Sequence, residues 1–478
     1  MAGTMTLVVT LFFLLMAANH RGAAGQFCGD TVSVVAPRQE RVSDDAMNVV
    51  YLSDGSNFDD QVALQLLLKS PNVNLKAIYI QGNAWAHRGS TYANFYNTMY
   101  LHGVTDVPIL SGSVYALEEE EAAAATGRSP ETDYRAVVPA ENLLFADSLW
   151  GLSPFLPPSS KYFDPLLDTY TDNASVPLLA EIIEGLDDGE TITVLSVGTL
   201  TPLAKMLDIL DADRLESVLN RVDRLVLMGG AVYVPGNIFT SPNNPNAEFN
   251  IYNDPHAAQR AFVGLSQHGV PITMVPLDAT EDVSLSEELF DELTESPATP
   301  EAEFIGALLE RVRATWFAPE LFFESIFLWD PTAAILMFDR SAINSGGNVT
   351  IPLKVVTDQG VYGDEQGATR ECTAEEAEDS TLCAMVEVVT DVDGDAINTI
   401  LLELLQSDVN SAVRPLACPG QDSENVTNGA GSCDIVAGCG AASQMCKHDE
   451  SCSQGGLGCI AETGCRYCGF GRFSEISC

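Results

Sequence analysis

Residues 49–64 read VVYLSDGSNFDDQVAL, and this stretch joins an apolar run, a polar turn and a second apolar segment. The first run predicts a short buried strand, the turn formers after it end that strand, and the residues after the aspartates predict a helix. A strand, a turn and a helix in this order form the opening unit of a parallel sheet. Asp54, Asp59 and Asp60 would then lie at the carboxyl end of the first strand, where open α/β sheets bind ligands.

Three carboxylates so close in sequence repel one another unless a cation neutralises them or they share a proton. A hard divalent cation with oxygen ligands is the simplest neutralising group. The alternative is an acidic N-cap on a solvated loop. This stretch alone does not decide between the two interpretations.

Further apolar runs end in polar turns along the chain, and each predicts a strand. The runs cover residues 75–80, 107–110, 191–197, 225–228, 272–277, 353–357 and 385–390. Helical stretches cover residues 91–102, 176–186, 285–290, 300–316 and 396–405. Strands that alternate with helices predict an α/β fold, with an open, mostly parallel sheet and helices on both faces. Residues 113–162 break this pattern and predict a long surface insertion.

The N-terminus predicts a signal peptide over residues 1–25. Thr6 to Ala18 is an apolar run too short to span a bilayer comfortably, and the small residues 22–25 follow it as a signal-peptidase site would. No later apolar run is long enough for a membrane span. We therefore expect a secreted, extracellular protein with no membrane span in the mature chain.

The cysteines indicate a separate C-terminal module. Of the 12 Cys, nine follow residue 417, a density typical of disulfide-stapled modules in oxidising compartments. We predict an α/β domain over residues 26–412 and a small cysteine-rich module over residues 413–478. Cys372 and Cys383 bracket an acidic loop and are expected to pair with each other. A bridge from the module back to Cys28 stays open, because connectivity cannot be deduced from spacing.

Composition also limits the partners. The formal charge is −44, from 67 acidic and 23 basic residues, which argues against nucleic acid and anionic membranes as partners because both require clusters of Lys and Arg. Sequons begin at Asn173, Asn348 and Asn425, as expected of a secreted glycoprotein.

Polar residues that packing does not explain follow several of the apolar runs. They are Asn83, Asn237, Glu248, Asn250, Asp254 and Asp330. Six sequence pieces carry the pattern: DGSNFDDQVAL, the turn Gly82-Asn83, SVGTLTPLA from Ser196, LVLMGG with VPGN ending at Asn237, NAEFNIYNDPHAA from Asn246, and FLWDPTAA around Asp330. In this order they make residues 49–406 resemble the inosine-uridine preferring nucleoside hydrolase family. The resemblance implies the Rossmann-like sheet of that family.

The resemblance also implies a chemistry, because the family cleaves the N-glycosidic bond of ribonucleosides with a tightly held Ca²⁺. It places Asp54, Asp60, Asp330 and the carbonyl of Val197 at the ion, and it makes Asp54 the catalytic base. The residues that it implies at the ribose are Asp59, Asn83, Met228, Asn237, Glu248 and Asn250. A small-molecule ribonucleoside is thus the expected substrate. Family members are usually dimers or tetramers, which implies a homo-oligomer by analogy only.

The sequence departs from the family pattern in its opening motif. Leu52 stands where the family has its first Asp, and one extra residue lies between Asp54 and Asp59. Placing the extra residue within 56–58 keeps Asp54 as the base. In the other register, Gly55 would occupy the base position and the protein would be inactive.

The sequence also departs from the family pattern on the leaving-group side of the site. Many family members have a His just before the final Asp, and Trp329 stands there. Purine-preferring members stack the nucleobase on aromatic rings, so Trp329 and Trp150 are candidates for that contact. The alternative makes Trp150 a loop anchor and Trp329 a core residue.

Three functions remain open at this stage. The first is a secreted, Ca²⁺-dependent, purine-preferring nucleoside hydrolase that serves purine salvage. The second is a catalytically degenerate descendant of the same fold that acts as an extracellular binding protein through its cysteine-rich tail. The third is an unrelated disulfide-tailed binding or wall protein, which would leave the Asn, Glu and Asp cluster unexplained.

Overall fold

The computed structural model describes residues 42–55, 58–83, 88–104, 106–112, 115–117, 172–238, 244–315, 319–360 and 363–407. The predicted signal peptide, the cysteine-rich module and Trp150 lie outside these residues. Nearly all of the predicted insertion over residues 113–162 also lies outside them. The boundaries of the predicted domains therefore stay predictions.

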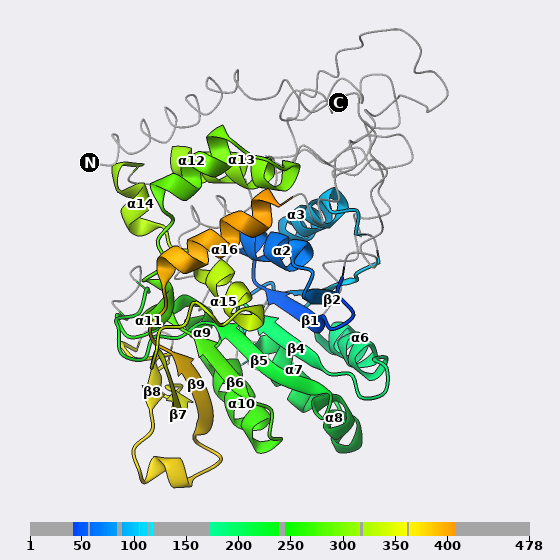
Figure 1. Ribbon diagram of the computed structural model, residues 1–478. Coiled ribbons are helices and arrows are strands. Elements are labelled where there is room, and N and C mark those ends of the chain that lie inside the picture. The colour runs from blue at the N-terminus through cyan, green and yellow to red at the C-terminus, as the bar shows by residue number, and fades with distance from the viewer. Residues whose placement is uncertain are drawn as a thin grey trace, which may run out of the picture. The chain divides into compact units, whose positions relative to one another are not determined.

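The described residues form one nine-stranded sheet in the order β3-β2-β1-β4-β5-β6-β9-β7-β8 (Figure 1). The strands are β1 Met47–Ser53, β2 Val73–Ile80, β3 Ile109–Ser111, β4 Ile192–Ser196, β5 Val222–Met228, β6 Ile272–Val275, β7 Asn348–Val355, β8 Thr369–Glu371 and β9 Ala384–Val389. Pairing is parallel from β3 through β9, whereas β7 is antiparallel to both of its neighbours. The predicted open, mostly parallel sheet is confirmed.

Helices connect most of these strands. They are α2 Phe58–Lys69, α3 Arg88–Leu101, α6 Asp172–Glu184, α7 Thr201–Ile209, α8 Ala212–Leu219, α9 Phe249–Tyr252, α10 Pro255–Gln267, α11 Leu277–Thr280, α12 Glu287–Glu295, α13 Pro300–Thr315, α14 Phe322–Ser325, α15 Trp329–Phe338 and α16 Gly394–Gln406. Two short 3₁₀ helices are η6 Pro319–Leu321 and η7 Glu376–Glu378. Asp393 caps α16 by accepting a hydrogen bond from the Ala396 N–H, so the acidic residues before α16 form a helix start.

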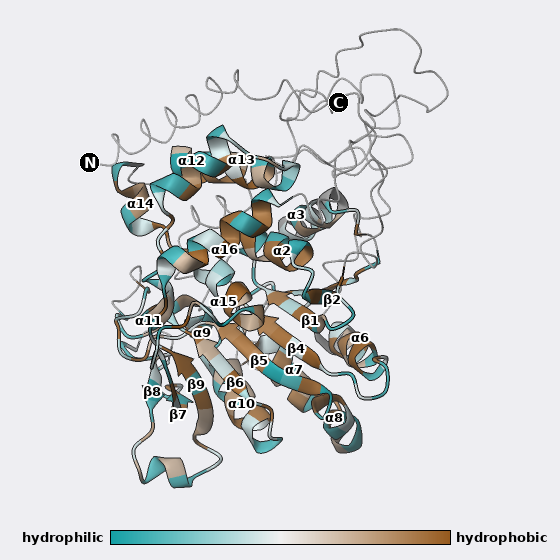
Figure 2. Ribbon diagram, in the orientation of Figure 1, coloured by the Kyte–Doolittle hydropathy of each residue, from teal (hydrophilic) through white to brown (hydrophobic). Residues whose placement is uncertain are grey.

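Alternation along β1 shows that helices cover both faces of the sheet. Val50 and Leu52 join a buried core that includes residues of α6, α7 and α10. Tyr51 points to the other face, where its hydroxyl donates to the backbone carbonyl of Asp60 in α2 at 3.1 Å. On that face α2 packs against α15 and α16. Figure 2 shows the central strands β1, β4 and β5 mostly hydrophobic, as expected for strands covered on both faces.

The antiparallel edge of the sheet, which consists of β9, β7 and β8, carries the expected disulfide. Cys372 follows β8 and Cys383 precedes β9, and their sulfur atoms are bonded. The predicted pairing of these two residues is confirmed. Among the described residues, every helix is too short or too polar to cross a membrane.

Candidate active site

The site lies where the strand order reverses. From β1 the chain continues to β2 on one side, whereas β4 pairs with β1 on the other side. Ligands of open α/β sheets bind at the carboxyl ends of strands at such a point. Asp54 follows β1 there, and Gly198 follows β4. A Cβ atom on Gly198 would lie 2.5 Å from the Asp54 Cβ and 2.9 Å from the Asp54 nitrogen, so only glycine lets these two turns meet.

Three carboxylates converge at this point. Asp59 and Asp60 belong to the first turn of α2, and Asp330 belongs to the first turn of α15. One carboxylate oxygen from each lies within 4.8 Å of those of the other two. All three residues are buried, with at most 7% of their surface exposed. The positive ends of the two helix dipoles favour negative charge at this position.

The surroundings of Asp59 and Asp330 favour the neutral forms of these two residues unless a cation is bound. Burial raises the pKa of Asp59 to about 7. Burial also raises the pKa of Asp330 well above its usual range, and the nearby charges of Asp59, Asp60 and Asp54 raise it further. Three buried carboxylates that oppose one another's ionisation match the hard oxygen ligands that Ca²⁺ prefers. The residues present therefore fit a divalent cation.

The composition of the cluster differs in one member from the ligand set that the resemblance implied. Asp59 belongs to the group of three, and Asp54 does not. Asp54 is 4% exposed and lies near enough for its charge to raise the pKa of Asp330. The hydroxyl of Ser53 donates a hydrogen bond to Oδ1 of Asp60, a contact that the sequence analysis missed. A serine directly before an aspartate at a strand end was the available signal.

Asn250 joins the carboxyl ends of β4 and β5. Its Nδ2 donates to the carbonyl oxygens of Val197 and Met228, each at 3.2 Å. The Val197 carbonyl, predicted as a metal ligand, therefore lies beside two of the predicted ribose contacts. A carbonyl oxygen has a second lone pair, so this hydrogen bond leaves one acceptor position for an ion.

Glu248 holds the backbone of the site together. Its carboxylate accepts hydrogen bonds from the N–H groups of Gly230 at 2.9 Å, Asn250 at 2.9 Å and Ile251 at 3.1 Å, and it thereby caps α9. Burial raises the pKa of Glu248. Asn237 acts similarly, because its Oδ1 accepts from the Phe249 N–H at 2.8 Å. These backbone contacts of Glu248 and Asn237 were not predicted from the sequence.

Asn83 belongs to a buried hydroxyl and amide network. Its Nδ2 donates to Oγ1 of Thr201 at 2.8 Å, and its Oδ1 accepts from Thr199 at 2.9 Å. Thr201 in turn donates to Oδ2 of Asp254 at 2.6 Å. The two threonines were missed as site residues, although they belong to the quoted piece SVGTLTPLA. Their contacts join positions more than 50 residues apart, which spacing cannot reveal.

Trp329 begins α15 directly before Asp330 and is half-buried. Its ring lies 6.3 Å from the ring of Phe58 and 5.7 Å from that of Phe327, both tilted by 57°. Its indole nitrogen Nε1 is buried without a hydrogen-bond partner among the described residues. Trp329 therefore packs against two aromatic rings beside the acidic cluster, and its predicted base contact stays a prediction.

The family model described as "Inosine-uridine preferring nucleoside hydrolase" matches residues 51–399. The chain belongs to this nucleoside hydrolase family. The match includes each predicted site residue from Asp54 to Asp330, and it supports the resemblance in the six sequence pieces.

Relatives in the nucleoside hydrolase family are similar to part of this chain. Nucleoside hydrolase 4 from Arabidopsis thaliana is 31% identical over 273 residues, which cover 53% of this chain and 47% of the plant protein. The pyrimidine-specific ribonucleoside hydrolase RihA from Photobacterium profundum is 30% identical over 278 residues, 57% of this chain and 74% of the bacterial protein. The chain thus spans about half the length of the plant relative.

Solved structures of nucleoside hydrolases share the fold of this chain. The inosine-uridine preferring nucleoside hydrolase from Bacillus anthracis has a TM-score of 0.54 at 21% identity, and the match covers 75% of this chain and 99% of that one. A purine-preferring ribonucleoside hydrolase from Gardnerella vaginalis has a TM-score of 0.55 at 20% identity, covering 76% and 99%. At these identities the likeness establishes the fold alone.

Proposed function

We propose that the protein is a secreted, Ca²⁺-dependent hydrolase that cleaves the N-glycosidic bond of ribonucleosides to release the base and ribose. The observation that carries this proposal is the buried group of Asp59, Asp60 and Asp330 beside Asp54, at the topological switch point of a nucleoside hydrolase sheet. Such a group combines a metal-binding function with carboxylates that can move a proton.

Asp60 and Asp330 would hold the ion, and Asp54 and the Val197 carbonyl would complete its oxygen ligands. Calcium bound there would supply the positive charge that orders a water molecule and the two vicinal ribose hydroxyls. Asp59 lies in the same cluster and would accept a hydrogen bond from a ribose hydroxyl. Buried acceptors of this kind reject deoxy sugars, because the carboxylate would then be left unpaired.

Asp54 would act as the general base. It follows β1 directly, is buried, and is held against the turn at Gly198. In that position its carboxylate would accept a proton from the attacking water while the sugar ring develops positive charge. Asn83, Asn237, Asn250, Met228 and Glu248 would line the ribose, and the hydrogen bonds among them limit their movement.

Purine nucleosides are the preferred substrates in this proposal, because the indole of Trp329, directly before Asp330, would stack on the base. Two neighbouring phenyl rings support its orientation. A purine covers more of the indole face than a pyrimidine and gains more from stacking, on the order of 1 kcal/mol.

Secretion is supported by the disulfide between Cys372 and Cys383 and by the apolar N-terminal run. Disulfides persist in oxidising compartments and are rare in the cytosol. A homo-oligomer follows only from analogy with the family.

The test is to incubate the purified protein with inosine, guanosine, adenosine, uridine and 2′-deoxyinosine, with and without a chelator, and to assay free sugar. We expect the protein to release ribose from ribonucleosides, and faster from purine nucleosides than from uridine. Chelation should abolish the release of ribose, and added Ca²⁺ should restore it. The rival function, a degenerate binding protein, predicts calorimetric binding of inosine without release of ribose. Release that persists after complete removal of metal would exclude the calcium-dependent mechanism.

A further inference from the structure

Helix α2 carries a stripe of buried polar side chains. The stripe runs along the helix, away from the end that carries Asp59 and Asp60. Gln61, Gln65 and Lys69 are spaced four residues apart, so they lie along one side of the helix. Each is at most 2% exposed, and every residue of α2 is buried. A helix buried on all sides is expected to be apolar throughout, so this polar stripe requires an explanation.

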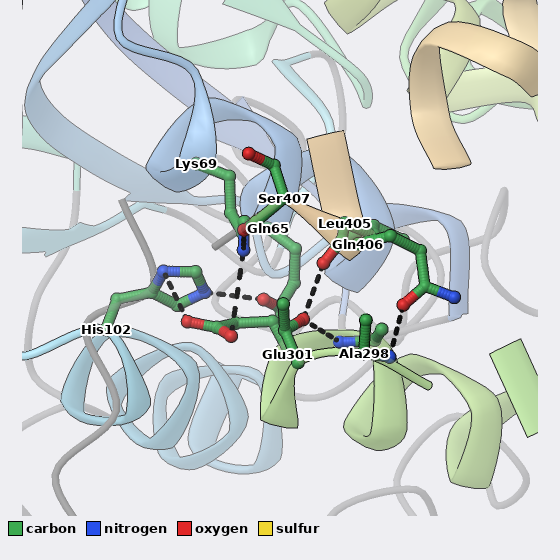
Figure 3. Close-up of polar contacts among 10 residues, drawn as sticks. Gln65, Lys69, His102, Ala298, Glu301, Leu405, Gln406 and Ser407 are labelled. Atoms are coloured by element: carbon green, nitrogen blue, oxygen red, sulfur yellow. Dashed lines mark hydrogen bonds and ion pairs between the residues drawn. The ribbon is translucent and has the colours of Figure 1, made fainter. Parts of the chain in front are cut away.

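The partners of the stripe come from elements far apart in the sequence (Figure 3). The Thr98 hydroxyl of α3 donates to Oε1 of Gln61 at 2.6 Å. Nε2 of His102, which directly follows α3, lies 2.5 Å from Oε1 of Gln65. The side chains of both partners are buried. The first two positions of the stripe therefore fix α2 to α3.

Lys69 occupies the far end of the stripe. Its Nζ lies 3.7 Å from Oε2 of Glu301 in α13 and donates to the carbonyl of Ser407 after α16 at 2.8 Å. Oε1 of Glu301 lies 3.9 Å from Nδ1 of His102. Figure 3 shows these side chains converging from four separate segments. The ion pair is fully buried on both sides, with 0% of either side chain exposed.

The stripe costs stability compared with an apolar one. Nε2 of Gln61 and Nε2 of Gln65 have no hydrogen-bond partner among the described residues. Unpaired buried amides are unfavourable, and the desolvation of a buried ion pair can exceed the attraction between its charges. Apolar side chains at these three positions and at their partners Thr98, His102 and Glu301 would fill the same interface without either cost. Stability therefore does not explain the stripe.

The directional requirements of its polar contacts explain the stripe. Apolar packing tolerates a small slide or rotation of a helix, whereas hydrogen bonds and a buried ion pair require particular positions. The first turn of α2 carries Asp59 and Asp60, which must meet Asp330 in the first turn of α15. Lys69 lies nine residues beyond Asp60, about 14 Å along the helix axis. A slide of α2 would separate these carboxylates.

We propose that Lys69 and Glu301 are positioning residues. Together with Gln61 and Gln65 they fix the rotation and the axial position of α2, and so hold Asp59 and Asp60 in place against Asp330. This inference rests on the proposed function, because it assigns the stripe to the geometry of the proposed calcium site.

The test replaces the ion pair by apolar side chains of similar length, Lys69→Met with Glu301→Met, in the full chain. Such replacements of buried ion pairs are often neutral or stabilising. We expect an unfolding temperature, measured in chelator, equal to or above that of the wild type. We also expect a calcium dissociation constant, measured by calorimetry, that is larger by about 10-fold to 100-fold, as for other residues that orient metal ligands. Turnover of inosine should fall with it.

The matched control is Lys354→Met with Glu376→Met, which makes the same exchange at an ion pair between β7 and η7. Calcium affinity and turnover should not change in this control. If the first double variant does not fold, Gln61→Met with Thr98→Val removes a neutral contact of the same stripe and should also weaken calcium binding.

Wild-type affinity and turnover in a folded stripe variant would overturn the inference, and so would a loss of stability with unchanged calcium affinity. In both cases an active wild type leaves the proposed function intact. A wild type that neither binds calcium nor cleaves nucleosides would overturn both proposals.

Discussion

The carboxylates of Asp59 and Asp60 belong to adjacent residues but meet different surroundings. Oδ1 of Asp60 accepts a hydrogen bond from the Ser53 hydroxyl. Asp59 has its pKa raised to about 7 mainly by burial. These different contacts suit the roles proposed for the two acids, Asp60 at the ion and Asp59 at a sugar hydroxyl.

Asp54→Asn tests the assignment of the base. The variant should still bind inosine, because the other carboxylates and the ribose contacts remain, while turnover falls by about 10² to 10⁴. Calorimetry for binding and single-turnover kinetics for cleavage separate the two effects. Turnover at the wild-type rate would mean that another residue of the opening loop is the general base.

Trp329→Ala tests the base contact. The loss of packing against Phe58 and Phe327 lowers activity on every nucleoside, so the informative quantity is the ratio of kcat/KM for inosine to that for uridine. Stacking predicts that this ratio falls, because a purine gains more from the ring face. Trp329→Phe should restore part of it. A constant ratio in both variants would make Trp329 a packing residue only.

At the residue scale, the sequence predicted which residue types gather at the candidate site. It did not predict most of the hydrogen bonds that fix their side chains. Asp59, Asp60 and Asp330 were recognisable because each follows an apolar run in the sequence. The threonines beside Asn83 were not, since hydrogen bonds such as that from Asn83 to Thr201 join positions 118 residues apart. Only folding brings such partners together.

At the scale of elements, an ion pair connects strand β7 to the 3₁₀ helix η7. Lys354 of β7 donates a hydrogen bond to Glu376 of η7, and this contact lowers the pKa of Glu376 from 4.5 to about 2. A folded-state pKa below the unfolded one stabilises the fold above about pH 4.5, and this contribution is lost as the pH falls toward about 2.

Lys354→Met should therefore lower the unfolding temperature slightly at pH 6 and make no difference near pH 2. Thermal melts from pH 2 to pH 6 would measure the convergence of the two curves. Glu378→Gln, in the same 3₁₀ helix, is the control for simple removal of a charge. Parallel curves over the whole range would show that the contact contributes nothing.

The long apolar runs predicted the parallel strands to within a few residues, because buried strands need continuous hydrophobic sequence. Strand β8, at the edge of the sheet beside β7, was not predicted because its residues Thr369–Glu371 have no apolar pattern. Helix α2 begins at Phe58 instead of the predicted Gln61. Its first turn includes Asp59 and Asp60, where carboxylates are favoured, so the acidic residues belong to the helix.

At the scale of the whole molecule, α16 completes the hydrolase fold. Ile397, Leu401 and Leu405 on this helix are buried, and the Ser407 carbonyl after it accepts the hydrogen bond from Lys69. The C-terminal residues of the described chain thus support the helix that carries Asp59 and Asp60 of the candidate site.

A chain that ends at Ser411 should therefore fold and hydrolyse nucleosides like the full chain, whereas a chain that ends at Asp393 should not fold, because it lacks α16. Circular dichroism melts and the ribose assay would compare the two with the full chain. A chain ending at Ser411 that folds but is inactive would mean that the cysteine-rich module helps to build the site.

The complete burial of α2 also affects its hydrogen exchange. Amides exchange with solvent when local structure opens, and the slowest ones require global unfolding. All 12 residues of α2 are covered by strands and other helices, so the amides after its first turn should be among the last to take up deuterium. The two aspartates at its start would then be held by a helix that opens only rarely.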